Sequence, residues 1–391
     1  MRRVQVVSLI TLVLILSVTL AGCHSPLTYS LPLGGTATWH ADKGCELIKQ
    51  ERYDEAIEEL DKAIELDPNF AMAYYYRASA YMWKEQYDLA IADCNKAIEL
   101  DPNASWAYYA RARAYTRTKQ YDLAIADCNK AIELDPSNAS IYSARACVYI
   151  WTGQYDLAIA DANKAIELEP NLAVAYYYRA SAYMWKEQYD LAMADCNKTI
   201  GLDPGNAPTY GCRSCAYNAK GQYDLALADA NKAVEFDPDE AVHYIYRANT
   251  YLEKEEYNLA LADCNKAIEL DPELAEAYNY RADTYNRNGQ YDLAIADANY
   301  AIELVPDSAK PYDKRATAYY HKGQYDLALA DCNKAIELDP DRAQAYNVRA
   351  KVYNMLGERD LALADANKVL ELTKYYSIVN EAKSLIEQLS K

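Results

Sequence analysis

The sequence predicts an all-α protein, a solenoid of about ten helix pairs, and three observations support this. From Tyr53 to Tyr325 a Tyr recurs at one fixed interval, the thirty-four residues that separate Tyr53 from Tyr87. No insertion interrupts this series. A Pro follows each of these nine marker tyrosines fifteen residues later. Between them, apolar residues return with the spacing of helices. A fixed period of this length predicts stacked units, each burying its apolar face against its neighbours.

The composition agrees with one short unit copied many times. The 391 residues include 39 Tyr but only 2 Phe, and 58 Asp+Glu against 40 Lys+Arg give a net charge of -18. Because no basic stripe is available to displace counterions from phosphates, we expect no nucleic-acid partner. The four His are far apart, so the sequence predicts no metal site, and nothing in it indicates a cofactor.

The segment 1–23 has the pattern of an export signal. Arg2 and Arg3 precede an apolar run over residues 4–20, and the run ends in Leu20-Ala21-Gly22-Cys23. This ending resembles the lipobox of bacterial lipoproteins. The resemblance implies a signal peptide over 1–22, lipidation of Cys23 and a lipid-anchored tether over 23–36.

The resemblance also implies a location. We expect the protein at the bacterial cell membrane or outer membrane, lipid-anchored and facing outside the cytoplasm. Several acyl chains on one residue make a stable anchor. An uncleaved membrane anchor and a plain secretory signal are the alternatives for this segment.

Each unit is expected to form two helices in turn. In the second unit, Tyr74, Ala78 and Tyr81 fall on one face of a first helix. A second helix begins at the marker Tyr87 and ends before Pro102, because Pro disfavours helical geometry in the residue before it. Five units place Gly two residues before the marker slot, where a left-handed turn residue is expected: Gly153, Gly221, Gly289, Gly323 and Gly357.

Ten such units are expected over residues 37–374. They start near residues 37, 71, 105, 139, 173, 207, 241, 275, 309 and 343. The first and tenth units depart from the pattern, as array ends do. Residues 375–391 are expected to form a C-terminal capping helix.

The unit resembles the tetratricopeptide repeat. The residues that carry the resemblance are Tyr74, Ala78, Tyr81, Tyr87, Ala90, Ala97 and Pro102. The resemblance implies a right-handed superhelix in which the first helix of each pair lines a concave groove. It also implies that the chain binds another protein and is not an enzyme.

Two charged slots recur within the unit. Units two to ten carry Arg ten residues before the marker slot and Asp six residues after it, as in Arg77 and Asp93. Unit one has Lys43 and Glu59 there, so the charges are kept while the residues change. We expect each pair to join the two helices of its unit and fix their register. Nine separate anion sites are the alternative.

The cysteines also follow the repeat. Cys94, Cys128, Cys196, Cys264 and Cys332 share a slot that holds Ala in other units. A slot that alternates Cys with Ala predicts free, buried thiols. Cys212 and Cys215 form a CxxC pattern inside a predicted helix, which favours packing over a redox or metal role.

The resemblance implies that the groove is lined fifteen, twelve, eight, five and four residues before the marker. The candidate partner-binding residues in these slots are Tyr75, Met82, Trp83, Trp106, Tyr109, Arg113, Arg117, Trp151, Tyr177, Met184 and Trp185. A row of aromatic side chains on one surface is typical of a binding site. The alternative is that these side chains pack against neighbouring first helices. In units seven to ten the same slots become mostly polar, with Glu253, Glu276, Asp283, Asp313 and Lys351 among them.

The sequence therefore predicts a membrane-anchored, extracytoplasmic scaffold that holds another protein or an extended peptide in its groove. One alternative is a ligand-binding or accessory subunit of a cell-envelope complex. Another is a cytoplasmic adaptor whose leader has been misinterpreted. The residues of the groove do not assemble the dicarboxylate clamp of chaperone-binding relatives, and no catalytic motif is present.

Overall fold

The computed structural model describes residues 35–373 and 376–390, and all the regular structure in these residues is helical. The predicted signal peptide, Cys23 and all but the end of the predicted tether lie outside the described residues. Within them, no helix is both long enough and apolar enough to cross a membrane.

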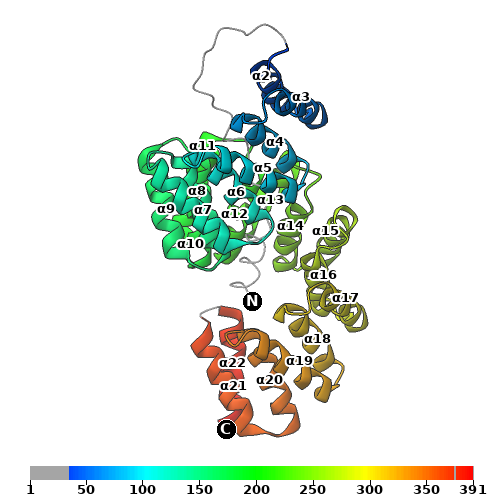
Figure 1. Cartoon of the computed structure of the whole chain (residues 1–391). Helices are drawn as coiled ribbons and strands as arrows, with labels where there is room; N and C mark the ends of the chain where they lie inside the picture. Colours follow the sequence, from blue (N-terminus) through cyan, green and yellow to red (C-terminus); the bar gives the residue numbers. More distant parts are fainter. Residues whose placement is uncertain (1–34, 374–375, 391) are drawn as a thin grey trace. The chain divides into compact units, whose positions relative to one another are not determined.

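The helices follow one another in pairs (Figure 1). Three residues join the two helices of units one to nine, and two residues join those of unit ten. The helices are α2 (Ala37–Lys49), α3 (Tyr53–Leu66), α4 (Ala71–Trp83), α5 (Tyr87–Leu100), α6 (Ser105–Arg117), α7 (Tyr121–Leu134), α8 (Ala139–Trp151), α9 (Tyr155–Leu168), α10 (Ala173–Trp185), α11 (Tyr189–Leu202), α12 (Ala207–Ala219), α13 (Tyr223–Phe236), α14 (Ala241–Glu253), α15 (Tyr257–Leu270), α16 (Ala275–Arg287), α17 (Tyr291–Leu304), α18 (Ala309–His321), α19 (Tyr325–Leu338), α20 (Ala343–Leu356), α21 (Arg359–Leu372) and α22 (Tyr376–Leu389).

The predicted fold class is confirmed: the chain is an all-α solenoid of tandem helix pairs. Its described residues divide into two compact parts. The N-terminal part, residues 35–204, holds α2 to α11, and the C-terminal part, residues 205–390, holds α12 to α22.

A left-handed residue separates the two helices of every unit. The five predicted glycines have φ between 72° and 81°, which confirms the expected turn. The other five units place Glu51, Glu85, Lys119, Glu187 or Glu255 in this slot, with φ between 57° and 62°. The turn is therefore set by the packing of the helices, which imposes it even where a side chain disfavours it.

Small residues form the contacts between helices. Ala78, Ala90 and Ala97 of unit two are fully buried. Alanine pairs also join successive units, as in the cluster that holds Ala97 and Ala107. Because alanine adds little bulk, the helices approach closely and the interior stays densely packed.

In unit one, a large side chain on the second helix faces a glycine on the first helix. Leu60 stands in the slot that holds Cys or Ala elsewhere, and Gly44 faces it from α2. A Cβ atom on Gly44 would overlap the Leu60 side chain. The opposite end of the array is covered by α22, whose Ile378, Ala382 and Leu385 pack against α20 and α21.

Candidate partner-binding surface

The eleven candidate residues lie on the first helices of units two to five, and we call them the aromatic face. α4 carries Tyr75, Met82 and Trp83; α6 carries Trp106, Tyr109, Arg113 and Arg117; α8 carries Trp151; and α10 carries Tyr177, Met184 and Trp185. All four helices belong to the N-terminal part.

These side chains differ in how far they reach solvent. Tyr177 and Met184 are 1% exposed and Tyr75 is 8% exposed, so they support the surface from beneath. Trp83 is 37% exposed, and the other seven are half-buried. The side chains that a partner could touch are therefore the four Trp, Met82, Tyr109 and the two Arg.

Three of the Trp side chains stack on marker tyrosines of the preceding unit. Trp83 lies on Tyr53 with ring centroids 5.9 Å apart, Trp151 on Tyr121 at 6.2 Å, and Trp185 on Tyr155 at 5.1 Å. The ring planes are within 16° of parallel in each pair. Each indole is thus held in place by the neighbouring unit.

The fourth Trp is held differently. Trp106 meets the ring of Tyr75 edge-on, with centroids 4.9 Å apart. These stacks are the contacts that the packing interpretation expected. They leave Trp83 partly exposed as a fixed apolar surface, so packing and partner binding are compatible at this residue.

Arg113 and Arg117 give the aromatic face its charge. The two side chains are one helical turn apart on α6, and the guanidinium of Arg113 lies 5.7 Å from the ring centroid of Tyr109. In the five groove slots of α4, α6, α8 and α10 they are the charged residues, and no Asp or Glu occupies these slots. The groove slots of these four helices therefore hold two Arg and no acidic residue, in a chain of net charge -18.

In units eight to ten, which belong to the C-terminal part, the same slots are mostly polar, and charged side chains pair between successive first helices. Glu276 accepts hydrogen bonds from Lys310 at 3.1 and 3.2 Å, and Glu253 pairs with Arg287 at 3.3 Å. Lys314 lies 2.9 Å from Asp283. Burial lowers the pKa of Lys310, although Glu276 raises it. These groups neutralise one another.

The predicted register pairs are confirmed in units two to ten. In each, the Arg donates from Nε and Nη2 to the two carboxylate oxygens of the Asp at 2.6–2.8 Å. The pairs are Arg77–Asp93, Arg111–Asp127, Arg145–Asp161, Arg179–Asp195, Arg213–Asp229, Arg247–Asp263, Arg281–Asp297, Arg315–Asp331 and Arg349–Asp365. The hydrogen bonds to Asp93 raise the pKa of Arg77, and burial raises the pKa of Asp93. These arginines are committed to their own carboxylates and do not form nine anion sites.

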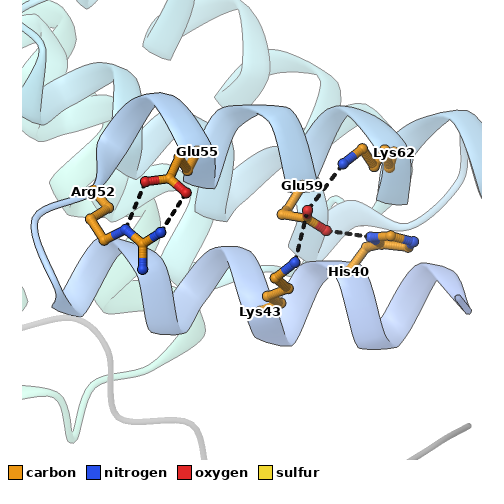
Figure 2. Close-up of polar contacts among 6 residues, drawn as sticks. All are labelled: His40, Lys43, Arg52, Glu55, Glu59 and Lys62. Carbon is orange, nitrogen blue, oxygen red and sulfur yellow. Dashed lines mark hydrogen bonds and ion pairs between the residues drawn. The ribbon is translucent and has the colours of Figure 1, made fainter. Parts of the chain in front are cut away.

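Unit one replaces this pair with a larger cluster (Figure 2). Glu59 on α3 is bonded to Nδ1 of His40 at 2.6 Å, to Lys43 at 3.0 Å and to Lys62 at 3.0 Å. Burial raises the pKa of Glu59, but the three hydrogen bonds outweigh it and lower the pKa to about 2. The cluster joins α2 to α3 as the Arg–Asp pair does in other units.

Family models described as tetratricopeptide repeat match most of the array. The matched residues are 41–105, 105–138, 139–172, 207–240, 241–274, 264–296 and 314–342, more than half of the chain in total. The chain belongs to the tetratricopeptide repeat family.

Solved structures with similar folds span most of the chain. The crystal structure of the APC/C hetero-tetramer Cut9–Hcn1 has 16% identity and a TM-score of 0.57, and the match covers 90% of this chain and 87% of that one. A tetratricopeptide repeat protein from Parabacteroides merdae ATCC 43184 has 20% identity and a TM-score of 0.53, over 63% and 98%. Yeast Tom70 has 19% identity and a TM-score of 0.49, over 90% and 96%. At these identities the likeness to the first two structures shows the fold alone. No curated protein matches the chain.

The repeat also explains the cysteines. None of the nine described cysteines forms a disulfide, and all except the half-buried Cys45 are buried. Burial raises the pKa of Cys147 to about 11, so its reactive thiolate form is rare at neutral pH. Cys212 and Cys215 are each 1% exposed within α12. Among the described residues, no group of three or more potential ligands is placed to hold a metal ion.

The sequence did not predict one set of hydrogen bonds, which join neighbouring units. The register arginines also donate from Nη1, at 2.5–3.1 Å, to an Asn or Asp of the preceding unit. These links are Arg77–Asp61, Arg111–Asn95, Arg145–Asn129, Arg179–Asn163, Arg247–Asn231, Arg281–Asn265, Arg315–Asn299 and Arg349–Asn333. An Asn that recurs eight residues after the marker was the available signal. Each tetratricopeptide unit that makes such a link is thus bonded both within itself and to the unit before it.

Proposed function

We propose that this tetratricopeptide repeat protein is a lipid-anchored, extracytoplasmic scaffold that binds another protein or an extended peptide on its aromatic face. The observation that carries the proposal is the aromatic face itself. Trp83, fixed by stacking and partly exposed, lies on the same face as two arginines with no carboxylate in the surrounding groove slots. Family membership supports a role in protein–protein interaction.

The chemistry of the face defines a partner. Stacked indoles offer a rigid apolar surface, so little side-chain entropy is lost when an apolar partner residue packs on them. Arg113 and Arg117 would bind a carboxylate, because a guanidinium can donate two parallel hydrogen bonds to one. The expected partner segment therefore carries apolar side chains next to an acidic one.

The test is a double substitution, Trp83→Ala with Trp185→Ala. We expect recovery of the partner by pull-down to be lost while helical circular dichroism is kept. His321→Ala is the matched control, because His321 occupies the same slot in unit nine and stacks on Tyr291 at 5.0 Å in the same way. Equal recovery with the double variant would remove the assignment of the aromatic face.

The anchor is tested separately. The sequence Leu20-Ala21-Gly22-Cys23 supports acylation of Cys23. We expect the full chain to incorporate labelled fatty acid in bacterial cells and to fractionate with membranes, and expect Cys23→Ala to do neither. Incorporation that persists in Cys23→Ala, or its absence from the natural chain, would contradict the anchor and leave the aromatic face untouched.

A further inference from the structure

His243 on α14 occupies a slot that no other ionisable residue takes in units two to ten. The slot lies fourteen residues before the marker, and its other occupants are Ala73, Ala107, Ile141, Ala175, Thr209, Ala277, Pro311 and Ala345. In three other units the alanine here shares a core cluster with an alanine of the preceding second helix: Ala97 with Ala107, Ala165 with Ala175, and Ala335 with Ala345. His243 therefore places a titratable ring in an apolar junction between units.

No hydrogen bond compensates the His243 ring for its burial. His243 is 1% exposed, and neither ring nitrogen has a hydrogen-bond partner among the described residues. The ring stacks on Tyr246 with centroids 6.1 Å apart. Tyr246 is itself seated against Gly211 of α12, where a Cβ atom would overlap its ring. His243 and Tyr246 are therefore both enclosed within a closely packed junction.

The ionisable groups around His243 offer little to a proton on the ring. Asp237, at the end of α13, is half exposed and 3.9 Å from Nε2. At the N-cap of α14, the Glu240 side chain accepts a hydrogen bond from the N–H of Val242 at 3.3 Å. On α12 and α15, Arg213 is bonded to Asp229 and Asp263 to Arg247. Burial lowers the pKa of His243 to about 4.

We propose that the junction between units six and seven is an acid-sensitive joint, in which protonation of His243 separates α14 from α13. An exposed histidine has an ordinary pKa of 6.5, above the value in the closed junction. The open form therefore binds the proton more tightly, and acid favours it. The contribution of His243 to closing is complete above pH 6.5 and is lost as the pH falls towards 4.

Hydrogen–deuterium exchange of the full chain at pH 7.5 and pH 5.0, corrected for the intrinsic rates, tests the joint. With a His243 pKa of 6.5 in the open form and about 4 in the closed form, the equilibrium constant for opening rises about 30-fold from pH 7.5 to pH 5.0. We expect this rise in peptides of α13 and α14 of the natural chain and not in His243→Ala, which carries the residue of five other units. His321→Ala should behave as the natural chain.

A second measurement does not depend on a variant. The chain has four His, so selective ¹³C labelling gives four resolvable imidazole signals. We expect His243 to stay neutral at pH 5.5 in the closed form. Protonation near pH 6.5 without loss of protection, or an equal loss of protection in His243→Ala, would overturn the joint. Neither measurement depends on the aromatic face or on a partner.

Discussion

At the scale of single residues, the charged pair of each unit shows what a repeated sequence reveals. Arg and Asp recur sixteen positions apart, and unit one keeps their charges with different residues, so their contact could be predicted. The third bond, from Arg111 to Asn95 at 2.7 Å, could not be predicted with the same argument. It joins neighbouring units, and its geometry depends on how the units stack.

Five units place a residue other than glycine in the left-handed turn, and this conformation lowers the stability of the fold. Glu85 has φ 57° in a slot where Gly153 has φ 74°. A side chain in this conformation costs about 1 kcal/mol relative to glycine. We expect Glu85→Gly to raise the free energy of unfolding of the N-terminal part by about 0.5–1 kcal/mol. We expect Gly153→Ala to lower the same free energy by about 1 kcal/mol.

Urea denaturation followed by circular dichroism measures both changes. Glu85→Ala is the control, because it removes the side-chain charge but keeps a Cβ atom in the left-handed turn. If Glu85→Ala stabilises the protein as much as Glu85→Gly does, the effect is electrostatic and the conformational explanation is wrong.

At the scale of elements, the ends of the helices follow from local chemistry. Pro102 ends α5, and Asp101 before it accepts a hydrogen bond from the N–H of Asn103 at 3.0 Å. Such signals recur in nearly every unit, which is why the helix pairs were predictable. The stacking of Trp83 on Tyr53 was not, because the two rings are distant in the chain and belong to different units.

The helix α22 gives a prediction at this scale. Its Leu385 is 7% exposed and packs in a cluster with Val369 and Ala350. We expect Leu385→Ala to lower the stability of the last unit by about 2–3 kcal/mol, the cost of a cavity in a core. Hydrogen exchange of α20 to α22 measures it, and Lys383→Ala, an exposed change on the same helix, is the control. Unchanged exchange in Leu385→Ala would mean that α22 does not cap the array.

At the scale of the whole molecule, the fixed period of the marker tyrosines determined the fold because each unit buries its apolar face only against its neighbours. The binding surface is less determined by sequence. Trp83 and Tyr177 both occupy groove slots, yet one is 37% and the other 1% exposed, since exposure depends on the side chains packed around each slot. The sequence could therefore identify the residues of the aromatic face but could not predict which of them are exposed.

Site-specific photo-crosslinking in cells tests the central claim most directly. A photoreactive residue at Arg117, on the aromatic face, is compared with one at Ala126, which is exposed on the second helix α7. We predict a protein adduct from position 117 that disappears when Trp83→Ala and Trp185→Ala are added, and no such adduct from position 126. An adduct of equal yield from both positions, or one that survives the double substitution, would contradict partner binding on the aromatic face.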